Sequence, residues 1–184
     1  MSLQPVITVK NLSKHFSVPL KSEGFGASVK SLFNRQYKTV KAVDKISFEI
    51  KGGEMIGFLG PNGAGKTTTL KLLTGLLKPT RGEAWLLGEP VERAASRRRL
   101  GFLPEQPYFY EYLTGIEYLE LAGQLSGLAG REAHERARRW LGRVGLGARP
   151  RLLLRKYSKG MLQRLGLAAA LLHEPELLIL DEPM

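Results

Sequence analysis

The stretch Gly60-Pro-Asn-Gly-Ala-Gly65-Lys66-Thr67 decides the fold of this chain of 184 residues. It fills every fixed position of the phosphate-binding loop pattern G-x-x-x-x-G-K-[ST]. Glycines let the backbone curl until successive amides point inward at phosphate oxygens, and the N-terminus of a following helix adds partial positive charge there. The apolar run 55–59 before the loop and the apolar periodicity of 67–77 after it indicate a strand and a helix. The sequence therefore predicts an α/β nucleotide-binding core.

The loop residues divide into two predicted roles. Lys66 offers a flexible point charge to the β- and γ-phosphates, and Thr67 offers a hydroxyl ligand to Mg²⁺. The rest of the predicted ATP-binding set forms the loop around the phosphates, in which every residue except the proline can offer a backbone amide: Gly60, Pro61, Asn62, Gly63, Ala64, Gly65 and Thr68. The alternative is a glycine-rich turn that matches by accident, and the expected strand and helix on either side argue against it.

The run 177–180 (Leu-Leu-Ile-Leu) ends in two acids and is expected to form the second half of the site. A buried strand would present Asp181 at its C-terminal end, where the carboxylate can hold Mg²⁺ through water. Glu182 beside it can polarise the attacking water as a general base, and Lys66 and Glu182 are thus the predicted catalytic residues. Acids also follow apolar runs at ordinary helix N-caps, so this pair gains its meaning from the phosphate loop upstream.

The rest of the chain alternates between strand and helix patterns. Strand patterns occupy 5–10, 42–50, 83–87 and 100–103. After Pro107 the sequence pattern becomes typical of helices, beginning with the capping-box spacing of Thr114 and Glu117. A further helix is expected to bury one face, formed by Ala133, Ala137, Trp140, Leu141 and Val144. Another helix is expected over 158–172, whereas 19–38 indicates a flexible excursion with a short helix around 28–33.

Composition restricts the class of protein. The chain has 28 Lys and Arg against 17 Asp and Glu, a formal net charge of +11, and no cysteine. It has no apolar run of about 18 residues, so nothing in it is expected to span a bilayer. His15, His134 and His173 are far apart in sequence and form no ligand pair. The cations are spread over several segments, which favours solvated helix faces, with a surface near phospholipid headgroups as the alternative.

The segment Tyr157-Ser158-Lys159-Gly160-Met161 resembles the signature sequence of ABC transporter ATP-binding subunits. Gln106, within Leu-Pro-Glu-Gln-Pro, resembles the family's Q-loop glutamine. The resemblance implies that two subunits sandwich two ATP molecules, and that Gln106 joins Thr67 and Asp181 around Mg²⁺. It also implies that Ser158, Lys159, Gly160 and Met161 contact the ATP of the partner subunit.

Lysine and methionine in this signature are similar to those of ABC-2-type exporters. That resemblance implies an ATPase at the cytoplasmic face of the cell membrane, working as a homodimer or pseudo-dimer with a separate permease. It further implies one ABC-type ATP-binding domain, with a β subdomain and P-loop core over about 1–107 and 166–184. The helical subdomain is expected over about 108–165.

Two points stay open in the sequence. The aromatic side chain that stacks on adenine is Phe16 when counted from the first strand, or Tyr37 when counted back from the second. The chain also ends at Met184, whereas the family continues with a D-loop and a further strand. We therefore expect a chain that is truncated after its acidic pair, marginally stable, oligomeric or aggregation-prone, and poor at hydrolysis.

Two rival functions remain at this point. The charge of +11 is compatible with an ABC ATPase that acts on nucleic acid or ribosomes, although such proteins usually carry two cassettes. The irregular signature is compatible with a non-catalytic regulatory cassette, against which the intact Lys66, Asp181 and Glu182 argue.

Overall fold

The computed structural model describes residues 4–19 and 37–182. The chain divides into two compact units, Met1–Arg93 and Ala94–Met184, and each is described by itself. In the described residues, no helix combines the length and the apolar character that crossing a membrane requires. The predicted helix around 28–33 and most of the excursion 19–38 lie outside the described residues.

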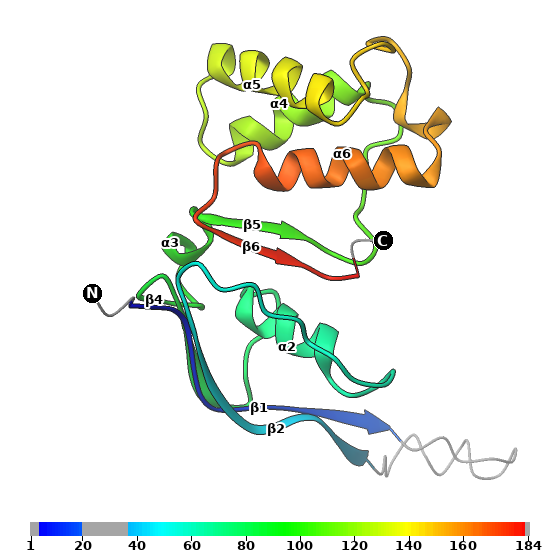
Figure 1. Cartoon of the computed structure of the whole chain (residues 1–184). Helices are drawn as coiled ribbons and strands as arrows, with labels where there is room; N and C mark the ends of the chain where they lie inside the picture. The colour runs from blue at the N-terminus through cyan, green and yellow to red at the C-terminus, as the bar shows by residue number, and fades with distance from the viewer. Residues whose placement is uncertain (1–3, 20–36, 183–184) are drawn as a thin grey trace, which may run out of the picture. The chain divides into compact units, whose positions relative to one another are not determined.

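The first unit is built on a four-stranded antiparallel sheet (Figure 1). Its strand order is β2-β1-β3-β4, with β1 at Pro5–Pro19, β2 at Tyr37–Lys51, β3 at Arg81–Leu86 and β4 at Glu89–Pro90. Helix α2 (Lys66–Leu73) supplies Leu72 and Leu73 to a core that also buries Val9, Leu12 and Leu86. The three strands predicted in this unit upstream and downstream of the loop are therefore confirmed, and the first two are longer than expected.

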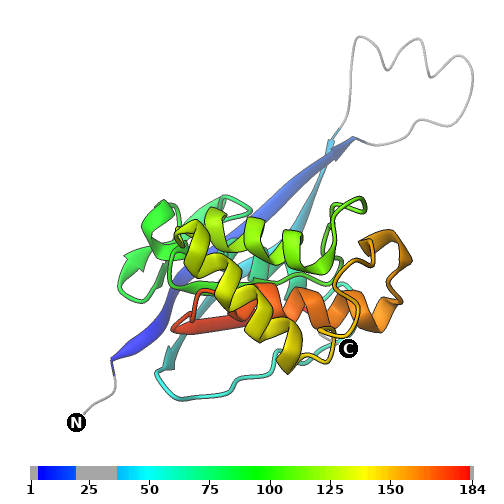
Figure 2. The same ribbon diagram turned by 90° about the horizontal axis from the view of Figure 1, so that it is seen from above.

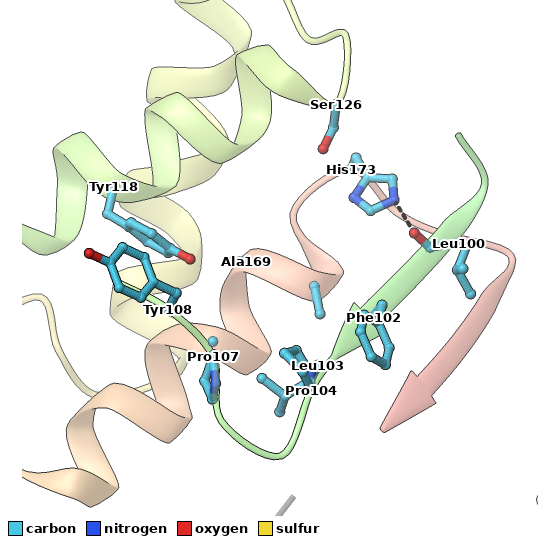
Figure 3. A pocket seen from close by; sticks show the side chains of 12 residues that line it. Leu100, Phe102, Leu103, Pro104, Pro107, Tyr108, Tyr118, Ser126, Ala169 and His173 are labelled. Carbon is cyan, nitrogen blue, oxygen red and sulfur yellow. Dashed lines mark hydrogen bonds between the residues drawn. The ribbon is translucent and has the colours of Figure 1, made fainter. Parts of the chain in front are cut away.

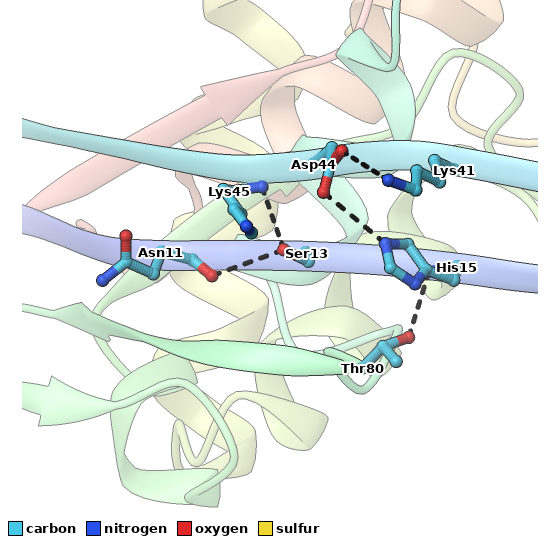
Figure 4. Close-up of polar contacts among 7 residues, drawn as sticks. All are labelled: Asn11, Ser13, His15, Lys41, Asp44, Lys45 and Thr80. Atoms are coloured by element: carbon cyan, nitrogen blue, oxygen red, sulfur yellow. Dashed lines mark hydrogen bonds and ion pairs between the residues drawn. The ribbon is translucent and has the colours of Figure 1, made fainter.

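Hydrogen bonds between side chains and backbone fix the middle of the long β1–β2 ribbon (Figure 4). The backbone amide of Lys45 donates to Ser13 Oγ at 2.9 Å, and the His15 amide donates to Thr80 Oγ1 at 3.0 Å. Asn11 and Lys45 have left-handed φ angles of 49° and 52°, and the register between the strands shifts several times nearby. Bulges of this kind increase local twist, and they set the direction of the outer ribbon, which Figure 2 shows from above.

The strand expected at 55–59 is not formed. Residues 54–60 have no strand structure, and Met55 and Leu59 are 99% and 95% exposed. A strand is stabilised by hydrogen bonds to a neighbouring strand, and no described residue pairs with this run. Its apolar composition alone therefore does not produce the element.

The helix expected over 67–77 is shorter than predicted. Helix α2 ends at Leu73, with Thr74 as its C-cap, and Gly75 follows with a left-handed φ of 70°. Glycine is the residue that most readily adopts this conformation and ends helices. As a result Leu76 lies beyond the helix and is 60% exposed.

In the second unit one helix covers a pair of parallel strands, and two further helices pack on its other side (Figure 1). These elements are β5 (Leu100–Leu103), α4 (Gly115–Leu125), α5 (Gly130–Arg143), α6 (Lys159–Leu171) and β6 (Leu177–Leu180), with a short α3 at Ala94–Arg97 and a 3-10 turn at Leu154–Lys156. Their shared core buries four leucines almost completely: Leu119, Leu154, Leu165 and Leu172. The predicted α5 face is confirmed, since Ala133, Ala137 and Leu141 are buried.

The start of α4 is the capping box that the sequence predicts. The Thr114 backbone amide donates to Glu117 Oε2 at 2.7 Å, and the Glu117 amide donates in return to Thr114 Oγ1 at 3.4 Å. The Thr114 hydroxyl also donates to Glu117 Oε2, at 2.7 Å. The hydrogen bonds from the Thr114 amide and then from its hydroxyl hold the pKa of the Glu117 carboxyl below its usual range. The cap therefore works best when Glu117 is ionised.

Candidate nucleotide-binding site

The phosphate loop has a backbone shape that depends on glycine. Gly63 and Gly65 have left-handed φ angles of 83° and 88°, and Gly65 is the N-cap of α2. A Cβ atom at Gly65 would lie 2.4 Å from the carbonyl oxygen of Ala42 on β2, which is closer than such atoms approach. Both the φ angle and the close approach to β2 therefore require glycine at position 65, whereas nothing lies within 4 Å of a Cβ atom at Gly63.

The Lys66 ammonium lies over the loop. Its Nζ donates to the carbonyl oxygens of Gly60 at 2.8 Å and Pro61 at 3.2 Å. The first turn of α2 contains no acidic residue and its glycine N-cap has no side chain to accept from the backbone amides. A phosphate group bound here would meet a lysine charge, the positive end of a helix and inward-turned amides together.

The two candidate aromatics lie on the same ribbon at different distances from the loop. Phe16 pairs with Val40 and Tyr37 pairs with Pro19, and their exposed fractions are 37% and 57%. Because the loop meets β2 at Ala42, Val40 is two positions away and Tyr37 five. At about 3.4 Å per residue these separations are roughly 7 Å and 17 Å along the strand. The register favours Phe16 as the aromatic nearer to the phosphate loop.

In the second unit, the acidic pair and the Gln106 segment leave the same end of the parallel strands. Leu103 at the end of β5 is paired with Leu180 at the end of β6. Asp181 is 4% exposed, and its amide donates to Leu103 O at 2.9 Å. Glu182 is exposed and has a left-handed φ of 50°, a conformation that costs energy outside glycine and asparagine. Gln106 is exposed as well.

The signature-like segment opens helix α6. Ser158 caps the helix, since its Oγ accepts from the Met161 amide at 3.3 Å. Ser158, Lys159 and Gly160 are exposed, whereas Met161 packs partly buried against the helical core. Tyr157 is buried in the same core, and burial raises the pKa of its phenol. Three of the four predicted signature residues therefore face outward.

Two hollows flank the residues that follow Gln106. A cavity of about 350 Å³ lies between β5, α4 and α6, with Pro104 and Pro107 in its wall (Figure 3). On its far side His173 Nε2 lies 3.1 Å from Leu100 O. A second hollow, of about 450 Å³, is lined by the consecutive residues 108–113 and Leu121.

Three exposed tyrosines beside this second hollow were not among the predicted site residues. Tyr108, Tyr110 and Tyr112 are 85%, 56% and 77% exposed. Their alternation directly after Pro107 is visible in the sequence, and it is the signal by which they could have been found. A contiguous exposed aromatic segment commonly marks a protein contact.

Comparisons with known proteins agree with this geometry. A family model described as ABC transporter matches residues 43–184. An uncharacterised ABC transporter ATP-binding protein of Bacillus subtilis is 48% identical over 157 residues, which is 85% of this chain and 52% of that protein. The bacitracin transport ATP-binding protein of Bacillus licheniformis is 44% identical over 151 residues, 81% of this chain and 48% of that protein.

A solved structure, the dimeric post-hydrolysis state of an ATP-binding cassette bound to ADP and Pi, matches with a TM-score of 0.78 and 25% identity. The match covers 97% of this chain and 74% of that one. The likeness confirms the predicted α/β P-loop fold with its antiparallel sheet and helices. The chain spans about half the length of the two curated relatives.

Proposed function

The chain belongs to the ABC transporter family, as an ATP-binding domain, and from that premise we propose that it binds and hydrolyses ATP to power export through a separate ABC-2-type permease. The observation that carries this proposal is the geometry of the phosphate loop. A Cβ atom at Gly65 would clash with Ala42 O, and Lys66 Nζ donates a hydrogen bond to a carbonyl oxygen of the loop. The similarity to a bacitracin transport ATP-binding protein supports a role in transport.

Binding of ATP is assigned to the loop 60–68, with Lys66 exchanging its carbonyl partners for phosphate oxygens. Charge-assisted bonds to phosphate are stronger than bonds to neutral carbonyls, so this exchange is favourable. Phe16 is proposed to stack on adenine, because the register leaves it nearer to the loop than Tyr37.

The oxygen ligands proposed for Mg²⁺ are the Thr67 hydroxyl, the Gln106 amide and the Asp181 carboxylate. Hard oxygen donors of this kind suit Mg²⁺, which when bound neutralises developing charge on the phosphates. Glu182, exposed next to the buried Asp181, is proposed as the general base that takes a proton from the attacking water. Its left-handed backbone turns the chain immediately after β6.

A homodimer or pseudo-dimer is proposed as the working state. Ser158, Lys159 and Gly160 are exposed at the start of α6, where a helix N-terminus and a lysine charge suit the phosphate of an ATP held by the partner. The dimeric cassette with ADP and Pi is a precedent for such an assembly. Because Met161 is partly buried, its proposed part is to anchor the helix rather than to touch nucleotide.

The Gln106 segment and the helical subdomain 108–165 are proposed to transmit movement to the permease at the cytoplasmic face of the membrane. The hollows on either side of residues 104–113 leave space for that segment to move. The exposed tyrosines 108, 110 and 112 offer a contact surface for the permease.

The test is thermal unfolding of the chain with and without Mg·ATP. A ligand at a hundredfold excess over its Kd stabilises the folded state by about 2.7 kcal/mol. We expect this stabilisation in the wild type and in Lys71→Ala, a matched control that removes an exposed lysine from the same helix. Lys66→Ala should abolish it, and Glu182→Gln should keep it while slowing phosphate release at least tenfold. If Lys66→Ala kept the same shift in melting midpoint with Mg·ATP, the loop would not be the ATP-binding site.

A further inference from the structure

One long segment of the second unit has no negative charge. Between Glu135 and Glu174 the sequence contains no Asp or Glu, but ten Lys or Arg residues. The whole chain has 17 acids in 184 residues, so three or four would be expected in a segment of this length. Solvated helix faces normally mix both signs, as α5 does in its first half with Glu132 and Glu135.

Seven of these cations form what we call the basic face: Arg138, Arg139, Arg143, Arg149, Arg151, Arg155 and Lys156. All seven are exposed, and none has a carboxylate partner among the described residues. By contrast, Arg136 at the border of the segment is paired with both Glu132 and Glu174. The basic face thus keeps its positive charge uncompensated within the unit.

Five of the seven cations of the basic face, from Arg143 to Lys156, lie at the last residue of α5 or in the connection from α5 to α6. In Figure 1 this connection leaves α5 and descends to the start of α6 at the same end of the two helices. A Cβ atom at Gly145 would lie 3.6 Å from Arg164 Nη1, so the end of α5 lies near the second turn of α6. The Arg155 amide donates to Glu111 O at 3.1 Å, which ties the same connection to the exposed tyrosine segment.

Two of the arginines lie over aromatic rings. The Arg143 guanidinium is 5.0 Å from the Trp140 ring centroid, and that of Arg155 is 5.6 Å from the ring of Tyr112. Arginine with tryptophan or tyrosine is typical of the layer where lipid headgroups meet water, because each side chain has an apolar body and a polar end.

We propose that the basic face binds the anionic headgroups of phospholipids at a membrane surface. Each basic residue near such a surface adds attraction, and several together hold a domain without an inserted helix. The proposal does not depend on ATP hydrolysis. Its value for transport rests on the proposed function, since the tyrosine segment offered to the permease adjoins the same face.

The experiment is sedimentation of the chain with vesicles of phosphatidylcholine alone or with about 30 mol% phosphatidylglycerol. We expect binding only to the anionic vesicles, and loss of that binding when salt rises from about 0.1 M to about 1 M. The variant Arg139→Gln, Arg143→Gln, Arg149→Gln, Arg151→Gln should bind these vesicles several hundredfold more weakly.

The matched control removes four exposed lysines from the first unit: Lys38→Gln, Lys51→Gln, Lys71→Gln and Lys78→Gln. It has the same net charge as the arginine variant, and it should bind like the wild type. Melting midpoints and the Mg·ATP shift check that both variants fold. Equal losses in the two variants, or no preference for anionic vesicles, would overturn the proposal. A different result would be that the chain binds a single-stranded RNA more tightly than the vesicles, with that binding lost only in the arginine variant. That result would overturn lipid binding and would identify the basic face as a nucleic-acid-binding surface.

Discussion

The apolar run 55–59 before the phosphate loop has a higher share of apolar residues than the helical layer of the second unit, yet only the helical layer forms regular structure. In the helical layer Leu119, Leu154 and Leu165 are at most 1% exposed. In the run 55–59, Met55 and Leu59 are almost completely exposed and no strand forms.

The difference shows where each element obtains its hydrogen bonds. A helix satisfies its backbone within the segment, so α4, α5 and α6 need from one another only packing. A strand satisfies its backbone through a neighbour, and none of the described strands is hydrogen-bonded to residues 54–60. The loop that follows nevertheless has its shape, because glycine conformations and the contact with Ala42 are local to the first unit.

The largest expected effect comes from truncating a leucine in each region. Leu119→Ala removes a fully buried side chain from the helical core and should lower the free energy of unfolding by about 2–5 kcal/mol. Leu59→Ala removes a side chain that is 95% exposed and should change it by less than about 0.5 kcal/mol. Denaturant unfolding of both variants measures the contrast. A comparable loss in Leu59→Ala would show that the run is packed in solution and would break the comparison.

A smaller effect is expected from alanine in the phosphate loop. Gly65→Ala combines a left-handed φ with a Cβ placed against Ala42 O, and we expect a cost of about 2 kcal/mol or more together with loss of the Mg·ATP shift. Gly63→Ala has a similar φ but open space, and it should cost about 1 kcal/mol. Melting midpoints with and without Mg·ATP test the pair. Equal costs would mean that φ alone, and not the contact with β2, fixes the loop.

The smallest effect concerns the helix cap. Thr114→Ala should destabilise the helical layer by about 1 kcal/mol at neutral pH. Because the folded-state pKa of Glu117 is lowered, the contribution of its carboxylate is complete above the unfolded pKa and is lost as the pH falls through the folded pKa. The stability gap between the wild type and Glu117→Gln should therefore narrow below about pH 4. A gap that stays constant from neutral to acid pH would contradict the ionised cap.

The sequence by itself determined the elements whose causes are local. The glycine-rich loop, the capping box of Thr114 and Glu117, the start of a helix at about residue 158 and the buried face of α5 were all predicted from residue type and spacing. The family followed from the same segments. The domain limits near 108 and 165 and the roles of the site residues stay predictions.

Only the tertiary structure decided the rest, because it depends on contacts between segments distant in sequence. The close approach of Gly65 to Ala42 brings the loop against β2, and the β1–β2 register places Phe16 nearer to that point than Tyr37. The pairing of β5 with β6 brings Gln106 and Asp181 to one end of a sheet. The missing strand at 55–59 belongs here too, since an apolar sequence specifies that a run can be buried, while its neighbours decide whether it is.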